Sequence, residues 1–231
     1  MKKRLLTSIS AVAAALALAP SASATLASYD AAIAADNGGG LPYAGILSSA
    51  QTFNGSNIAA VDFGSITGAA TFEFILEGDP VAGGRNGYIG RADANAGNSL
   101  RYEQWDDTGT LGFTRSGVAD YNLGVPSPTT ATHVTYLWDG AGTMELFIDG
   151  VSSGTVNGAT FEMPTGPGHL GNVSDGGGEG MVGTIHRMTT YDSALSTAQI
   201  ASHANAWLIP EPTGVALFGL AGFAMILRRR R

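Results

Sequence analysis

The dipeptide Asp149-Gly150 lies between two short runs, MELFI and VSSGTV, in which apolar and polar residues partly alternate. A two-residue turn between antiparallel strands of this type needs positive φ at both central residues, and Asp-Gly is among the sequences that adopt it best. The pattern therefore predicts a β-hairpin, which constrains the fold of this region more than any other feature. The segment WDGAGT (138–143) predicts a second turn immediately before it.

Residues 25–208 contain further runs of this kind, rich in aromatic and β-branched residues and separated by clusters of Gly, Asp, Asn and Pro. The predicted strands are TFEFILEG (71–78), SLRYEQW (99–105), TLGFTRS (110–116), THVTYLWDG (132–140) and MELFIDG (144–150). In the first of them, Phe72, Phe74 and Leu76 should share the buried face of a sheet. Many short strands, 33 glycines and the absence of an internal repeat favour one all-β sandwich.

One short helix is predicted at the end of this region, within SALSTAQIASHANAWL (193–208). Ser196 and Gln199 have the spacing of a capping box, which marks a helix start. The apolar positions that then recur at helical spacing are Ile200, Ala204 and Trp207 or Leu208. The helix should lay Ile200 against the edge of the sandwich and leave His203 on its exposed side.

The first 24 residues have the three parts of a secretory signal. A basic segment is followed by an apolar run from Leu5 to Ala19, and the small residues Ala22 and Ala24 then mark a signal-peptidase cleavage site. The run is apolar on every side, unlike an amphipathic first helix of a fold. We expect residues 1–24 to be removed on export and residues 25–208 to fold as one domain.

The chain ends in IPEPTGVALFGLAGFAMILRRRR (209–231). As a helix, the uncharged run 213–227 would be about 22 Å long, which is short for a hydrocarbon core of about 30 Å. The basic residues that follow are Arg228, Arg229, Arg230 and Arg231, and they should stop transfer and stay cytoplasmic. The tail is therefore predicted to be a transmembrane helix, with the folded domain on the outer side of the inner membrane.

The order of Pro210-Glu211-Pro212, an apolar segment rich in Gly and Ala, and terminal arginines resembles a PEP-CTERM sorting signal. That family occurs in bacteria with outer membranes, and the resemblance implies a temporary anchor that an exosortase, a membrane-embedded cysteine protease, cuts near the motif. Each proline disfavours helix at the residue before it, so the motif would present extended backbone to a protease. The product would be a cell-surface or extracellular protein. The alternative is a tail that is never cut and a permanently anchored periplasmic protein.

A second resemblance covers most of the domain. The segments HVTYLWDGAGTMELFIDGVSSGTV, HLGN and GMVGTIHRMTTYDSALSTAQI are similar to laminin G-like domains of the concanavalin A-like lectin/glucanase superfamily. The positions that match its hairpin and its ending are Asp149, Gly150, Gly183, Ile185, Tyr191, Leu195 and Ile200, and AQTFNGSNIAAVDFG (50–64) matches an earlier segment. The resemblance implies a jelly-roll sandwich of two antiparallel sheets. Turn and core positions speak for fold rather than activity.

Composition excludes several classes of function. Residues 25–208 carry eighteen carboxylates against five arginines and no lysine, a surface that repels nucleic-acid backbones. The chain has no cysteine, which excludes disulfides, thiolate zinc sites and a cysteine nucleophile. The histidines are His133, His169, His186 and His203, without the spacing of a zinc motif.

Glycanases of this superfamily carry paired carboxylates in an E-x-D-x-x-E arrangement, and the nearest candidate is EFILEGD, with Glu73, Glu77 and Asp79. Residues i and i+4 of a strand are about 13 Å apart, whereas a retaining glycosidase needs carboxyl groups about 5–5.5 Å apart. We therefore expect no catalytic residue here and interpret Glu73 and Glu77 as surface charge. A glycan-active enzyme is the alternative function.

Binding residues are less well marked than the fold. SDGGGEG (174–180) places Asp175 and Glu179 in a glycine-rich loop that could ligate calcium, although a polar loop without a ligand is the favoured interpretation. Other candidates are Asp36, Asn37 and Asp62 for calcium, and Tyr102 and Trp105, beside Asp106 and Asp107, for stacking on a sugar unless they lie in the core. The sequence predicts an exported, non-enzymatic binding or structural module that contacts polysaccharide or a surface protein.

Overall fold

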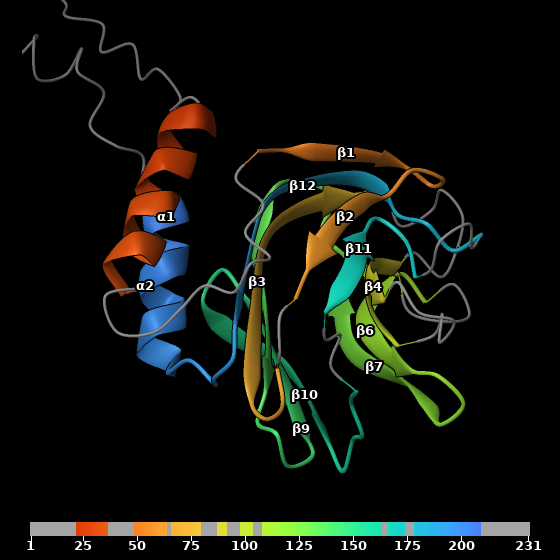
Figure 1. Ribbon diagram of the computed structural model, residues 1–231. Helices are drawn as coiled ribbons and strands as arrows, with labels where there is room; N and C mark the ends of the chain where they lie inside the picture. Colours follow the sequence, from red (N-terminus) through yellow and green to blue (C-terminus); the bar gives the residue numbers. More distant parts are fainter. Residues whose placement is uncertain are drawn as a thin grey trace, which may run out of the picture.

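The computed structural model of the chain describes residues 22–36, 49–63, 66–79, 87–91, 98–103, 108–162, 166–173 and 178–208. These residues form a sandwich of two antiparallel sheets, each of six strands, with two helices packed on one side (Figure 1). The predicted sandwich of two antiparallel sheets is confirmed. The expectation of a single helix in the domain is wrong, because a second helix precedes the first strand.

The strands of sheet A lie in the spatial order β1, β12, β3, β8, β9 and β10. Their bounds are β1 Gln51–Asn54, β12 Val182–Tyr191, β3 Ala70–Gly78, β8 Thr132–Trp138, β9 Thr143–Ile148 and β10 Val151–Asn157. The strands of sheet B lie in the order β2, β11, β4, β5, β6 and β7. Their bounds are β2 Ala59–Asp62, β11 Pro167–Leu170, β4 Gly87–Arg91, β5 Ser99–Arg101, β6 Thr110–Arg115 and β7 Ala119–Pro126.

The main core lies between the two sheets. Phe72, Phe74 and Leu76 of β3 point into it, as their alternation predicts, and all three are fully buried. The residues that sheet B contributes opposite them include Tyr88, Leu100, Leu111 and Phe113. The rings of Phe74 and Tyr88 meet edge to face with centroids 5.0 Å apart, a favoured aromatic geometry. Alternation along one strand is therefore enough to identify the inner face.

Strand β3 is also buried on its other face, because two helices cover the outer side of sheet A. Helix α1 spans Ala22–Asp36 and α2 spans Thr197–Leu208, and Figure 1 shows them lying side by side beyond β3. They enclose a second apolar cluster of Tyr29, Ile33, Ile75, Phe147, Tyr191, Leu195 and Ile200. Ile200 thus packs on the outer face of sheet A, whereas the sequence suggested an edge.

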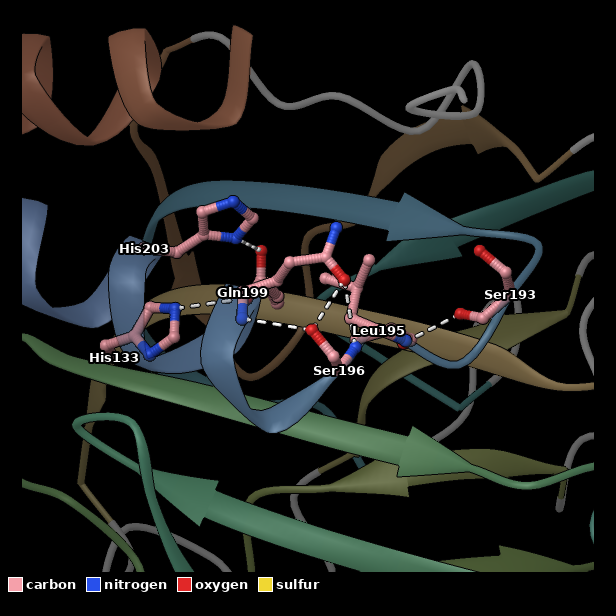
Figure 2. Close-up of polar contacts among 8 residues, drawn as sticks. His133, Ser193, Leu195, Ser196, Gln199 and His203 are labelled. Carbon is pink, nitrogen blue, oxygen red and sulfur yellow. Dashed lines mark hydrogen bonds and ion pairs between the residues drawn. The ribbon is translucent and has the colours of Figure 1, made fainter. Parts of the chain in front are cut away.

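The predicted capping box starts helix α2. The Ser196 backbone N–H donates to Gln199 Oε1 at 3.0 Å, and the Gln199 N–H donates to Ser196 Oγ at 3.3 Å (Figure 2). The segment before the helix is fixed to β3, since Thr71 Oγ1 donates to the Ser193 carbonyl at 2.8 Å and accepts from the Leu195 N–H at 3.0 Å. Local capping and this anchor to the sheet together determine where α2 begins.

Both predicted turns are confirmed. Asp149 has φ +49° and Gly150 has φ +78°, as the predicted hairpin between β9 and β10 requires. At the preceding turn the Asp139 carboxylate accepts the N–H groups of Ala141, Gly142 and Thr143 at 2.7–2.8 Å. The N–H of Thr143, followed by that of Ala141, lowers the pKa of Asp139 to about 2.

Helix α1 was missed because the small-residue pattern at this end of the chain matches a signal cleavage site. Leu26, Tyr29 and Ile33 are spaced three and four residues apart, and all three pack in the cluster beneath the helices. The predicted cleavage residues Ala22 and Ala24 lie in the first turns of α1, and cleavage after Ala24 stays a prediction.

The remaining predictions for the chain ends, residues 1–21 and 209–231, fall outside the described residues. They include the Pro210-Glu211-Pro212 motif, the run 213–227 and the terminal arginines. Neither of the two helices in the described part of the chain is long and apolar enough to cross a membrane.

Candidate functional site

Sheet B presents two rows of mostly polar residues on its outer face, over which no helix lies in the described part of the chain (Figure 1). The strand register aligns Ser99, Thr114 and Asp120 in one row across β5, β6 and β7. The neighbouring row holds Arg101, Gly112 and Asn122. We call the side chains of Ser99, Arg101, Thr114, Asp120 and Asn122 the sheet-B polar face. Leu100 and Phe113, between the rows, point the other way into the core.

A chain of hydrogen bonds crosses this face. Arg101 Nε donates to Thr114 Oγ1 at 2.7 Å, and Thr114 Oγ1 in turn donates to Asp120 Oδ1. Arg101 and Thr114 are buried, whereas Asp120 is exposed. Because each donor in such a chain polarises the next, the buried guanidinium strengthens and orients the contact to the exposed carboxylate. Asp120 is thus a fixed acceptor at the protein surface.

Asn122 is held beside it on the same strand. Its Oδ1 accepts from Thr110 Oγ1 at 2.9 Å and from the Gly124 N–H at 2.6 Å. The residue is exposed, and no described residue accepts a hydrogen bond from its Nδ2 group. Asp120 and Asn122 are two positions apart on one face of the strand, a separation of about 7 Å. The site therefore offers a fixed acceptor next to an oriented amide donor.

The calcium candidates that the structure describes do not form a metal site. Glu179 Oε2 lies 3.0 Å from the Arg101 NH1 group, so its carboxylate is engaged by a buried cation, and Asp175 lies outside the described residues. Asp62 is an exposed residue at the end of β2, and Asn37 is not described. Among the residues that the structure describes, no group of His, Asp or Glu side chains has the arrangement of a metal site.

The interpretation of Glu73 as surface charge is wrong. Its side chain is fully buried on the outer face of sheet A, beneath the helices. His203 Nδ1 of α2 lies 2.8 Å from Glu73 Oε2, and His133 Nε2 of β8 lies 3.5 Å from Oε1, which is ion-pair distance rather than a hydrogen bond. Figure 2 shows the two imidazoles approaching from different elements. The expectation that His203 is exposed is also wrong.

This environment shifts the ionisation of the carboxyl group. Burial raises the pKa of Glu73, but His133 and His203 together lower it by more, so its pKa lies below the ordinary value of 4.5. Glu77, four residues on, is half-exposed and lies 3.4 Å from His186 Nε2. The two glutamates of the candidate motif therefore lie in different environments, one fully buried and one half-exposed.

Two aromatic candidates have different outcomes. Tyr102 is buried in the main core, so it is not a surface platform for a sugar. Trp105, with Asp106 and Asp107, lies outside the described residues, and the strand predicted for 99–105 ends at Arg101. The polar face itself was missed, because its residues are aligned by strand register and no spacing in the sequence shows that alignment.

Residues 52–201 match the protein-family model Laminin_G_3, described as the concanavalin A-like lectin/glucanases superfamily. The chain belongs to this family. The match includes the hairpin and the ending on which the resemblance in the sequence was based, and it spans both sheets. No curated protein matches the sequence of this laminin G-like chain.

Solved structures of similar fold come from several kinds of protein. Domain 4 of AbnA, a GH43 extracellular arabinanase from Geobacillus stearothermophilus, is 20% identical with a TM-score of 0.52, over 67% of this chain and 76% of that chain. The SAP-like pentraxin from Limulus polyphemus is 17% identical with a TM-score of 0.50, over 70% and 82% of the two chains. The receptor-binding domain of a botulinum neurotoxin mosaic serotype C/D is 11% identical with a TM-score of 0.51, over 71% and 46%. At such identities the likeness establishes the fold alone.

Proposed function

We propose that this laminin G-like chain is an exported, non-enzymatic binding module that contacts polysaccharide through the sheet-B polar face. The observation that carries the proposal is the pair of exposed, fixed polar groups at Asp120 and Asn122, supported from below by the buried Arg101. A sugar hydroxyl both donates and accepts hydrogen bonds, so an oriented acceptor beside an oriented amide suits it. Groups that are already held in place lose little entropy when they bind.

The family and its structural neighbours support a carbohydrate ligand. The family description names lectins, and the structure of domain 4 of AbnA is a complex with arabinotriose. Sheet A is a less suitable surface, because α1 and α2 cover part of its outer face. The outer face of sheet B is therefore the preferred location for a ligand.

The negative charge of the domain indicates which class of polysaccharide it would bind. Residues 25–208 have eighteen carboxylates and five arginines, and Asp120 places one of those carboxylates in the site itself. Like charges across an interface cost affinity and slow association. We infer that the ligand is a neutral rather than an anionic polysaccharide.

Site variants test the assignment. Asn122→Ala removes an amide that faces the ligand and should weaken binding of a neutral oligosaccharide by about tenfold, the loss of one good hydrogen bond. Calorimetric titration of the full chain with a panel that includes arabinotriose measures this. Asn157→Ala, at an exposed asparagine of β10 on sheet A, is the matched control and should bind like the wild type. Equal affinities for all three proteins would contradict the assignment.

A glycan-active enzyme is the second candidate, favoured only by the family description. The paired carboxylates do not support it, because Glu73 is enclosed between the sheet and α2. A reducing-sugar assay with the same panel distinguishes the two functions. We expect no release of reducing ends, and turnover abolished by a single carboxylate substitution would establish the enzyme instead.

The proposal includes export, surface location and exosortase processing, which rest on the sequence patterns at 1–24 and 209–231. Mass spectrometry of the C-terminal peptide from surface and membrane fractions of the native host tests the processing. A terminus near Pro210 in the surface fraction is expected. An intact Arg228–Arg231 end in the membrane fraction alone would indicate a permanently anchored periplasmic protein.

A further inference from the structure

The cluster of Glu73, His133 and His203 is buried far from the sheet-B polar face and plays no part in the proposed binding. Each residue comes from a different element, namely β3, β8 and α2. All three side chains are 0% exposed, although they are among the most polar residues of the chain. A buried carboxylate is costly unless it is paired, so the two imidazoles are what allow Glu73 to remain ionised.

The surrounding elements bring further ionisable groups to this region, among them Asp149, whose carboxylate accepts the His133 backbone N–H at 3.2 Å. Helix α1 contributes Tyr29, whose ring lies edge-on to His133 at 5.6 Å, and Asp30, which forms a two-pronged ion pair with Arg187 of β12 at 2.9–3.2 Å. The Tyr191 ring of β12 stacks on His203 at 6.3 Å. Strand β9 contributes apolar Phe147, and its Glu145 bonds to Ser152. Neither tyrosine changes charge in acid, because burial raises the pKa of Tyr29 and tyrosine ordinarily ionises near pH 10.

Protonation of Glu73 removes the negative charge of this cluster. When the carboxyl group is ionised, it can only accept, so His203 Nδ1 must carry a proton and donate to it. When the carboxyl group takes up a proton it becomes neutral. The ionised acceptor to which His203 donates, and which lies at ion-pair distance from His133, is then lost from a site that is fully closed to solvent.

The arrangement of the two cores determines which part of the structure opens when Glu73 is protonated. The main core lies between the sheets, and the second cluster is a separate set of residues between sheet A and the helices. Of the two α2 side chains that are buried with Ile200, one is His203. The helices can therefore separate from sheet A while the sandwich stays folded, which is a local opening rather than global unfolding.

We propose that Glu73, His133 and His203 form an acid-operated latch that holds α1 and α2 on sheet A at neutral pH and releases them in acid. Release exposes the apolar side chains Ile75 and Phe147 on the outer face of sheet A. The protein then presents a second surface that is hidden at neutral pH.

The sign of the pH dependence follows from the carboxyl group. Its folded pKa lies below its ordinary value of 4.5, so it contributes stability that is fully present above pH 4.5 and is lost as pH falls through the folded pKa. Acid below that ordinary value should therefore open the latch, and neutral pH should keep it closed.

Hydrogen exchange followed by mass spectrometry on the full chain tests the latch. Between about pH 5 and about pH 3, after correction for intrinsic exchange, protection of α2 should fall by up to about tenfold per pH unit for each proton taken up. Protection of β3 and β8 should fall much less. Glu73→Gln should lower α2 protection at neutral pH and abolish most of its acid dependence.

The matched control is Glu77→Gln. Glu77 lies on β3, like Glu73, but its partner is the partly exposed His186 of β12, so the substitution should leave the exchange profile of α2 unchanged. If Glu73→Gln does not fold, His203→Gln serves instead, because its amide can still donate to the carboxylate but cannot acquire charge. It should fold at neutral pH and show a smaller acid response than the wild type, because the charge of His203 lowers the pKa of Glu73 and a neutral amide does not. Loss of protection in α2, β3 and β8 together, or an unchanged acid response in the variant that folds, would overturn the proposal.

Discussion

Gly150 shows how one residue can have two reasons to be glycine. The turn between β9 and β10 requires positive φ there, and the sequence predicts this from Asp149-Gly150 alone. The structure adds that a Cβ at Gly150 would lie 2.9 Å from the Ala201 Cα and the Ala204 Cβ of α2. The second reason is a contact between distant segments, which no local pattern contains.

These two reasons can be separated by mutation. Gly117 has φ +72°, and no neighbouring atom lies within 4 Å of the position that a Cβ would take, so Gly117→Ala should cost only the backbone strain, about 1–2 kcal/mol. Gly150→Ala should cost a further ~1–3 kcal/mol, the usual penalty of overpacking, because α2 must shift. Urea denaturation of both variants measures the difference. Equal losses would show that α2 does not press on the turn.

The burial of His203, which was predicted to be exposed, could have been predicted from its position in the helix. His203 follows Ile200 by three residues, which puts it on the same side of the helix as the apolar stripe. Glu73 carried no such signal. Alternation along β3 correctly puts it opposite Phe72 and Phe74, but only the packing of the helices determines whether that face meets water.

At the scale of elements, the ends of a helix or strand that are set by local hydrogen bonding could be predicted from the sequence. Which face of a sheet the helices cover could not. The start of α2 follows from Ser196 and Gln199, and the hairpin follows from its turn. The position of both helices on the outer face of sheet A depends on contacts between residues far apart in the chain, such as Asp30 with Arg187. Helix α1 was not predicted, because its start at Ala22 overlaps the predicted signal of residues 1–24.

The cap of α2 should be measurable. Ser196→Ala removes the side-chain acceptor for the Gln199 N–H and should cost about 1 kcal/mol of unfolding free energy. Ser202→Ala, an exposed position in the same helix, is the control and should be neutral or slightly stabilising, because alanine is the better helix former. Thermal unfolding followed by circular dichroism compares them. A larger loss for Ser202→Ala would mean that the capping box does not stabilise α2.

At the scale of the whole molecule, the sequence predicted the two-sheet sandwich and the family, but not the order of strands within the sheets. Strand β3 lies between β12 and β8, whose residues are far from it in the chain, and such pairing leaves no mark on local alternation. The same limitation hid the sheet-B polar face. Arg101, Thr114 and Asp120 become neighbours only once β5, β6 and β7 are in register.

The central claim is that the laminin G-like sandwich binds neutral glycan on sheet B. The most direct test is a titration of the isotopically labelled full chain with the best neutral oligosaccharide of the panel, followed by amide chemical shifts. Shifts should concentrate on β6 and β7 around Asp120 and Asn122 and leave α1 and α2 unchanged. The absence of any shift at millimolar ligand, or shifts confined to the helices and sheet A, would contradict the account.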